Sequence, residues 1–209
     1  MAALCSEEAQ HDAVRSTYAR KAKGADLQGP GPEAKGGANA HQDLKQISLD
    51  LGYTEEDLEV VGTSNLGLGS GNPLLFAKLA AGENVLDLGS GAGIDCMLAS
   101  RQVLPGGQVV GVDMTPEMIS KARLAVDKQR QKFPNVAFRL GEIEHLPVAD
   151  NTMDVVISNG VVCLVQDQQQ VFNECYRILK PGGRIAISDV VSKTKNLPSH
   201  LQTECALVE

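Results

Sequence analysis

Short apolar runs alternate with helical stretches over the second half of the chain, beginning near Glu83. Each run is rich in Val, Leu and Ile, as expected for strands that are buried on both faces of a parallel sheet. Such runs, separated by helical segments, are typical of a parallel sheet with crossover helices. We therefore predict an α/β fold with helices on both faces and with strands at 84–88, 108–112, 136–139, 153–158 and 184–189.

Two of the intervening helices have clear start signals. Thr115 and Pro116 suit the N-cap and the first helical position of a helix that runs to about Lys132. Asp167 is the expected N-cap of another helix, which continues to Leu179 before a Pro-Gly-Gly sequence stops it. The predicted order is therefore β-α-β-α-β-α-β-α-β.

The first 80 residues show a helical pattern instead. Val14, Tyr18 and Ala22 share one face of a short predicted helix at 11–23, and residues 42–61 have the spacing of a longer helix. We expect this part of the chain to form a helical cap over the sheet.

Two local signals divide the N-terminal part. Residues 24–37 hold five glycines and two prolines, so ordering them would cost much backbone entropy, and we predict a flexible linker. The Thr-Glu-Glu-Asp sequence at 54–57 resembles a capping box. The predicted organisation is a flexible segment with a short helix at 1–40, a helical cap at 41–80, an α/β core at 81–195 and a tail at 196–209.

Composition narrows the class of protein. The chain has 209 residues, of which 43% are hydrophobic and only 3% aromatic, so the predicted core is aliphatic. A net charge of −7, from 19 basic and 26 acidic residues, disfavours nucleic acid and anionic membranes as partners.

Cysteine usage and the N-terminus indicate a cytoplasmic protein. The five cysteines are scattered without a Cys-x-x-Cys pair, which favours reduced thiols over disulfides and predicts no metal site. Neither an export signal nor an apolar run of about 18 residues is found, so we expect no membrane span.

A glycine-rich segment, VLDLGSGAGIDC at 85–96, follows the first predicted strand. Its glycines allow a sharp turn that brings backbone N–H groups close to a ligand at the start of the next helix. A dinucleotide fingerprint would require glycine where Ile94 stands, and the carboxylate of Asp87 would repel a diphosphate. The same carboxylate would attract a cation, and S-adenosylmethionine carries a sulfonium and an ammonium group.

Two further segments follow neighbouring strands. Asp113 stands 24 positions after Gly89, at the strand end where an acid usually binds ribose hydroxyls. After the third strand, the adenine ring could lie between Met114 and Ile143. A glycine turn alone can be a simple connection, and Asp113 alone can be a helix cap. Because the three segments converge at one edge of the sheet, we favour a nucleotide-type site that binds S-adenosylmethionine.

These motifs resemble class I S-adenosylmethionine-dependent methyltransferases, and arsenite methyltransferases in particular. The similarity extends over about residues 47–198 and implies a seven-stranded Rossmann-like sheet, S-adenosylmethionine as cofactor and methylation of trivalent arsenic. It is carried by NLGLGSGNP at 65–73, VLDLGSGAGIDC at 85–96, GVDMTPEMISKAR at 111–123, FRLGEIEHLPVADNTMDVVISN at 138–159 and ILKPGGRIAISDVV at 178–191.

The resemblance also implies the cofactor-binding residues. Asp87 and Asp95 would face the methionine ammonium, Asp113 would bind the ribose, and Asn159 would meet the amino-acid end of the cofactor or the acceptor. The full set that matches motif positions is Asp87, Gly89, Ser90, Gly91, Asp95, Asp113, Met114, Ile143, Glu144 and Asn159.

The chain departs from this family at its cysteines, which bind the thiophilic arsenic. Ser70 and Gly160 stand where the family usually has cysteine, and the glycine-rich linker replaces an N-terminal cysteine pair. Cys163 lies three residues beyond Gly160, and a helical turn there would bring it near the same face, so we predict it as a catalytic residue. The alternative is that Cys163 is a small buried packing residue.

Other reactive side chains have simpler interpretations. Cys96 and Cys175 fall on predicted helices that face the sheet and are expected to pack there. The histidines, His11, His41, His145 and His200, are dispersed in the sequence, and we expect them on the surface or at helix ends.

The last predicted strand ends near Asp189, and about 20 residues follow it. Since a complete class I sheet has two more strands, we expect a C-terminally truncated sheet or a partner that covers its open edge. The substrate would be a small molecule or a metalloid. Three other functions stay open: a cofactor-binding pseudoenzyme or regulatory subunit, a methyltransferase for an organic small molecule, and a nicotinamide oxidoreductase, which Ile94 and Asp87 disfavour.

Overall fold

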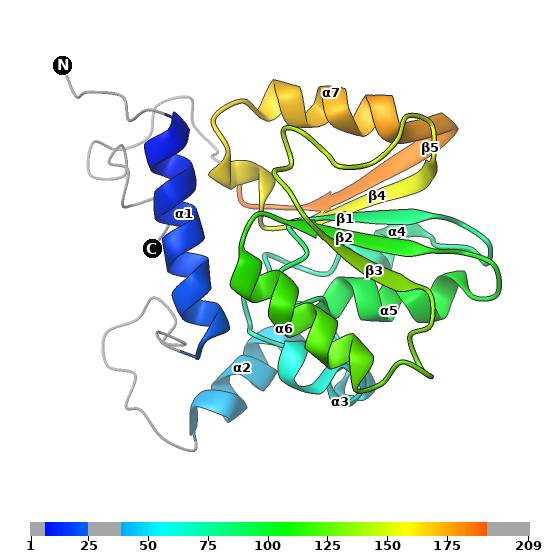
Figure 1. Ribbon diagram of the computed structural model, residues 1–209. Helices are drawn as coiled ribbons and strands as arrows, with labels where there is room; N and C mark the ends of the chain where they lie inside the picture. The colour runs from blue at the N-terminus through cyan, green and yellow to red at the C-terminus, as the bar shows by residue number, and fades with distance from the viewer. Residues whose placement is uncertain (1–6, 25–38, 192–209) are drawn as a thin grey trace.

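The centre of the molecule is one parallel sheet of five strands (Figure 1). The computed structural model describes residues 7–24 and 39–191. The strands lie in the order β3-β2-β1-β4-β5, and every neighbouring pair is parallel. Their bounds are β1 Val85–Leu88, β2 Val109–Asp113, β3 Val136–Leu140, β4 Met153–Asn159 and β5 Leu179–Ser188. The predicted parallel α/β architecture is confirmed.

The strand order reverses at the centre of the sheet. From β1 the chain moves outward to β2 and β3, and it then returns to the other side of β1 to form β4 and β5. The loops after β1 and β4 therefore leave the sheet side by side and in opposite directions. Open α/β sheets bind ligands at the carboxyl ends of the strands at such a reversal.

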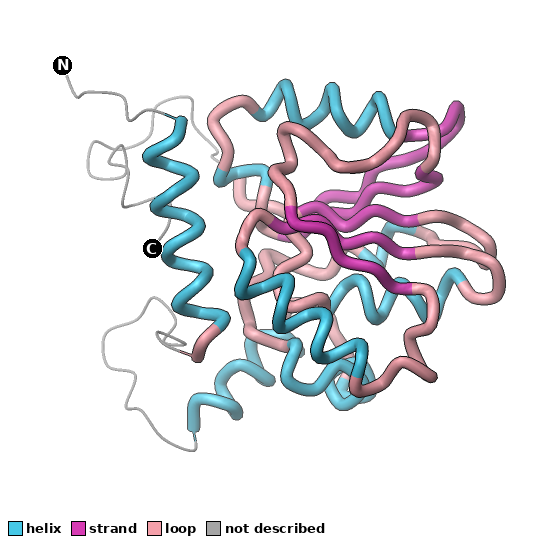
Figure 2. Tube along the Cα trace, viewed as in Figure 1, coloured by secondary structure: helices cyan, strands magenta, loops and turns pink. Residues whose placement is uncertain are grey.

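Helices cover both faces of the sheet (Figure 2). The apolar side chains of α5 (Ile94–Val103) and α6 (Pro116–Asp127) pack on one face. Those of α7 (Gln168–Ile178) pack on the other, together with the turn η2 (Val162–Leu164). Because β1 and β4 are buried on both faces, their sequences are nearly continuous apolar runs.

The N-terminal part of the chain forms short helices, as its pattern predicted. Their bounds are α1 Glu7–Ala22, α2 Asn39–Asp50, α3 Glu55–Val61, η1 Gly62–Ser64 and α4 Leu74–Ala77. In Figure 1, α1 stands apart from the sheet and lies beside α6, which it contacts. Val14 and Ala22 are buried along it, so the predicted apolar face is confirmed.

Three helix and strand limits differ from the sequence prediction. The helix predicted at 42–61 is broken, because the chain turns at Gly52, whose φ of +97° is left-handed, and restarts at a capping box in which Thr54 and Asp57 bond reciprocally. Helix α6 ends at Asp127 and not near 132, since turns then carry Phe133 into the core.

The strand β5 begins earlier than predicted, directly after α7, and its register shifts opposite Met153. It lies at one edge of the sheet, where the guanidinium of Arg184 donates to both carboxylate oxygens of Glu83, at 2.6 and 2.8 Å, and to the carbonyl of Ala77 at 2.7 Å. These bonds attach α4 to β5. The outward side of β5 has no strand partner among the described residues.

Some predictions fall outside the part of the chain described here. They are the linker beyond Gly24, the tail at 196–209, Cys5, Cys205, His200 and the side chain of His41. No helix within residues 7–24 and 39–191 is long and apolar enough to span a bilayer.

Backbone crowding at Gly107 gives a stability prediction. A methyl group at this position would collide with the carbonyl of Glu83 and lie 2.7 Å from that of Val103. We expect Gly107→Ala to lower the free energy of unfolding by about 3 kcal/mol, as overpacking does in a rigid core. At Gly82 an added methyl group would have no neighbour within 4 Å, and the left-handed φ of +88° is the only strain. We therefore expect Gly82→Ala to lower the free energy of unfolding by only about 1 kcal/mol. Equal urea midpoints for the two variants would contradict this account.

Candidate functional site

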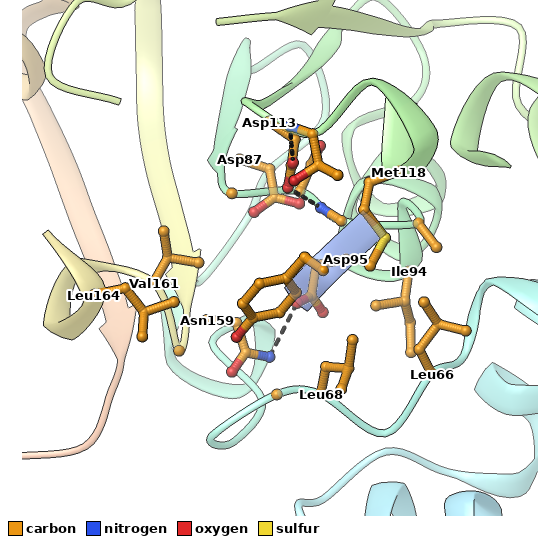
Figure 3. A pocket seen from close by; sticks show the side chains of 18 of the residues that line it. Leu66, Leu68, Asp87, Ile94, Asp95, Asp113, Met118, Asn159, Val161 and Leu164 are labelled. Atoms are coloured by element: carbon orange, nitrogen blue, oxygen red, sulfur yellow. Dashed lines mark hydrogen bonds between the residues drawn. The ribbon is translucent and has the colours of Figure 1, made fainter. Parts of the chain in front are cut away.

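A cavity of about 1090 Å³, counting its open mouth, lies at the carboxyl ends of β1 to β4 (Figure 3). Figure 3 shows Asp87, Asp95 and Asp113 on the sheet side and Leu66 and Leu68 across the cavity from them. The structure brings together all ten predicted cofactor-binding residues in the cavity wall: Asp87, Gly89, Ser90, Gly91, Asp95, Asp113, Met114, Ile143, Glu144 and Asn159.

The glycine loop after β1 forms the floor of the cavity and depends on its lack of side chains. Gly89 has a φ of +62°, and a Cβ there would collide with the side chain of Val161. The hydroxyl of Ser90 is buried and has no hydrogen-bond partner within the described part of the chain. A Cβ built on Gly111 would stand 2.7 Å from this oxygen, so the hydroxyl lies against the middle of β2.

Asp113, at the end of β2, is held by backbone groups. Its two carboxylate oxygens accept hydrogen bonds from the N–H of Gly91, at 2.9 Å, and from the N–H of Thr115, at 2.8 Å. Burial raises the pKa of Asp113, and these two hydrogen bonds oppose the rise. The carboxylate thus ties the glycine loop to the start of α6 while it lines the cavity.

Asp87 and Asp95 are a pair of buried acids between β1 and α5. Burial and the neighbouring charge of Asp95 raise the pKa of Asp87 well above its ordinary value, although the thiol of Cys96 donates to Asp87 at 3.2 Å. Burial also raises the pKa of Asp95, to about 6, against the hydrogen bonds that it accepts from Tyr53 and Asn159. Two desolvated acids this close favour a ligand that brings positive charge.

Asn159 connects the end of β4 to the loop at 65–73. Its Oδ1 accepts from the N–H of Ser70 at 2.8 Å and of Gly71 at 3.2 Å, and its Nδ2 donates to the carbonyl of Gly71 at 2.8 Å. A Cβ at Gly69 would stand 2.7 Å from Asn159 Nδ2, so this loop approaches closely because it has glycine there. The NLGLGSGNP motif is therefore a wall of the cavity.

Helix α1 closes another side of the cavity through charged and polar contacts. His11 Nε2 lies 3.0 Å from Glu144 Oε1, and Arg15 Nη2 donates to Glu142 Oε1 at 3.3 Å. Tyr18 also lines the cavity, and burial, followed by the nearby Cys163, raises its pKa to about 12. The expectation that His11 would have a surface role was wrong, because α1 folds back across the carboxyl ends of the strands and brings His11 into the cavity wall. His145 is exposed, as predicted.

The charges of the cavity wall have one sign. Asp87, Asp95, Asp113 and Glu144 line it, and within the described part of the chain no lysine or arginine does. A diphosphate would meet four acidic side chains here without a lysine or arginine to neutralise it, and the imidazole of His11 already contacts Glu144. A ligand with positively charged groups is the complementary one.

The predicted catalytic cysteine lies next to the cavity but not in its wall. Cys163 belongs to the helical turn η2 after β4, as predicted, and its neighbours Val161 and Leu164 line the cavity. Burial, followed by a hydrogen bond to Asp189, raises the pKa of Cys163 to about 12. Its side chain is therefore a neutral thiol near pH 7, which is a weaker metalloid ligand than a thiolate.

The two positions that carry cysteine in arsenite methyltransferases lie side by side in this fold. A Cβ built on Gly160 would stand 2.7 Å from the hydroxyl oxygen of Ser70. Gly160 has a φ of +69°, which favours glycine. Cys96 and Cys175 are fully buried and free, in agreement with their predicted packing roles.

Sequence reasoning missed the apolar and helical side of the cavity. Only the closeness of the N-terminal helices to the strand ends brings these residues in, and the sole signal in the sequence was the glycine-rich motif at 65–73. The missed residues of the N-terminal part include Tyr53, Ser64, Leu66 and Leu68. Ala92 in the glycine loop and Met118 on α6 were missed as well.

The raised pKa of Asp95 predicts how stability depends on pH. The folded state binds the proton of the Asp95 carboxyl more tightly than the unfolded state does. Protonation of Asp95 therefore stabilises the folded state at low pH, and this stabilisation is lost as pH rises from 3.8 through about 6. We expect Asp95→Asn to stabilise the unliganded protein at pH 8 by about 2 kcal/mol. Thermal unfolding between pH 4 and 8 measures this effect. The exposed Asp43→Asn on α2 is the control, and equal behaviour of the two variants would refute the assignment.

Comparisons with known proteins agree with this geometry. The family model described as "Methyltransferase domain" matches residues 79–209. An arsenite methyltransferase of Halobacterium salinarum is 55% identical over 170 residues, which cover 81% of this chain and 43% of the relative.

Two solved structures have the same fold. An arsenic(III) S-adenosylmethionine methyltransferase from Chlamydomonas reinhardtii is 34% identical, with a TM-score of 0.59 over 79% of this chain and 56% of that one. A SAM-dependent methyltransferase from Aquifex aeolicus is 25% identical, with a TM-score of 0.54 over 75% and 77% of the two chains. The chain spans about half the length of the arsenic-methylating proteins that it matches. It belongs to the methyltransferase-domain family of class I S-adenosylmethionine-dependent enzymes.

Proposed function

We propose that the chain binds S-adenosylmethionine in the cavity described above and transfers its methyl group to trivalent arsenic. The observation that carries the cofactor assignment is the wall of four carboxylates without a lysine or arginine among the described residues. The similarity to arsenite methyltransferases supports the acceptor.

The residues present fit the cofactor. Asp87 and Asp95 are buried acids suited to its ammonium group, and Asp113 stands at the strand end suited to its ribose. Met114 and Ile143 offer apolar surface to the adenine, and the glycine loop leaves backbone room beside them.

When bound, S-adenosylmethionine supplies an electrophilic methyl group on a sulfonium centre. The task of the chain is to hold donor and acceptor at short range and to exclude water, and not to transfer many protons. Leu66, Leu68 and Ile94 provide the apolar side of the cavity, and α1 covers it through the contact of His11 with Glu144.

A second candidate function is cofactor binding without arsenic methylation, in a regulatory or inactive relative. The specific observation in its favour is that Ser70 and Gly160 offer no thiol, and no cysteine lines the cavity within the described ranges. Under the first candidate, arsenic would bind Cys163, which is partly exposed and lies between the lining residues Val161 and Leu164, whereas Cys96 and Cys175 are fully buried.

We also propose a cellular location and a partner at the edge of the sheet. The free thiols of Cys96, Cys163 and Cys175 support a reducing, cytoplasmic location. The unpaired side of β5, with Ile185 40% exposed, supports a strand or partner chain that pairs with this edge.

The acceptor is tested by single-turnover assays with labelled S-adenosylmethionine, arsenite and a thiol reductant. We expect methylated arsenic from the wild-type chain and at least about a hundredfold less from Cys163→Ala, because one soft ligand is lost. Cys175→Ala removes a buried thiol away from the cavity and should keep full turnover. If Cys163→Ala keeps its turnover, Cys163 does not bind arsenic and is only a packing residue. Cofactor binding without turnover in the wild type, restored by Ser70→Cys with Gly160→Cys, would establish the second candidate.

The ribose role of Asp113 is tested by calorimetry. We expect Asp113→Ala to weaken S-adenosylmethionine binding by about 1–3 kcal/mol, because it strands the ribose hydroxyls and frees the N–H groups of Gly91 and Thr115. The exposed Asp127→Ala on α6 should bind as the wild type does. An unchanged affinity in Asp113→Ala would remove this residue from the cofactor site.

A further inference from the structure

Tyr53 lies at the turn between α2 and α3, directly after the left-handed Gly52. It is only 5% exposed, and its ring packs in the core with Leu58, Val61 and Met97. Its side chain nevertheless lines the cavity. The ring of Tyr53 thus belongs to the apolar core, while its side chain reaches the cavity wall.

The hydroxyl of Tyr53 has two side-chain partners. It donates to Asp95 Oδ1 at 2.7 Å and accepts from Asn159 Nδ2 at 2.9 Å. Asn159 Nδ2 also lies 3.1 Å from Asp95 Oδ2, so the three side chains form a closed ring of hydrogen bonds. Figure 3 shows Asp95 and Asn159 close together at the cavity.

Each member of this ring comes from a different part of the fold. Asp95 is in the first turn of α5, Asn159 ends β4, and Tyr53 comes from the helical N-terminal part. Neither Asp95 nor Asn159 has a lysine or arginine partner among the described contacts. Tyr53 therefore supplies a neutral donor that fixes Asp95 without neutralising its charge.

The environment keeps Tyr53 protonated. Burial, and then the charge of Asp95, raises the pKa of its hydroxyl well above the ordinary value. The hydroxyl therefore remains a donor at neutral pH. A phenylalanine at this position would fill the same space and would lose only the hydroxyl, with its bonds to Asp95 and Asn159.

Resting on the proposed function, we propose that Tyr53 is a positioning residue that orients Asp95 and Asn159 toward the amino-acid end of the cofactor. The hydroxyl acts through these two side chains and is not assigned a contact with the reacting atoms. Its loss would leave the ribose and adenine parts of the cavity intact, because Asp113, Met114 and Ile143 do not contact it in the ring of hydrogen bonds.

The inference is tested with two ligands that differ at one end. S-adenosylhomocysteine has the amino-acid group, whereas 5′-methylthioadenosine keeps the adenosine part and lacks it. We expect Tyr53→Phe to weaken S-adenosylhomocysteine binding by about tenfold and to change methylthioadenosine binding by less than about twofold. Tyr176→Phe is the matched control, because Tyr176 is 85% exposed on α7.

The possible results distinguish a failure of the role of Tyr53 from a failure of the proposed function. An equal loss for both ligands, with a lowered unfolding temperature, would make Tyr53 a structural residue only and would overturn the inference. Unchanged binding of both ligands would overturn it too. Wild-type protein that binds neither ligand would instead refute the proposed function, on which the inference rests.

Discussion

Three carboxylates, those of Asp87, Asp95 and Asp113, are buried at the carboxyl edge of the sheet, and no lysine or arginine of the described residues lines the cavity with them. Buried charge costs free energy unless it is paired or hydrogen-bonded. The fold meets part of this cost with backbone N–H groups at Asp113 and with Tyr53 and Asn159 at Asp95. The remaining cost appears as raised pKa values, and a positively charged ligand would relieve it. The rest of the site is arranged around this unbalanced charge.

The sheet and its glycines make that arrangement possible. The reversal of strand order between β1 and β4 leaves room at their ends, and Gly89 lets the loop after β1 pass against Val161 without a side chain in the way. Helix α1 then closes the cavity through the contact of His11 with Glu144 and of Arg15 with Glu142. The contact of His11 with Glu144 is largely buried, whereas that of Arg15 with Glu142 is partly exposed and contributes little free energy.

The acceptor side has a different chemistry from the cofactor side. Asn159 fixes the loop at 65–73 so that Ser70 faces Gly160. These are the two positions at which the resemblance to arsenite methyltransferases implies cysteine. The fold therefore keeps these positions adjacent although this chain has neither thiol. Cys163 follows three residues after Gly160, but burial and a hydrogen bond to Asp189 raise the pKa of its thiol and keep it protonated. Recognition of a soft metalloid would depend on displacing that carboxylate.

The sequence by itself determined the parallel sheet and the capping box at Thr54, because strand periodicity and helix-start motifs are local signals. The ten predicted residues that line the cavity came from the resemblance of the motifs to a known family. It did not reveal the break at Gly52 or the early start of β5, where local preference yields to packing. Only the tertiary structure decided that Tyr53 meets Asp95, which is 42 residues away, and that His11 meets Glu144 across 133 residues. Contacts of such separation arise from how helices pack on the sheet, and no short-range pattern encodes them.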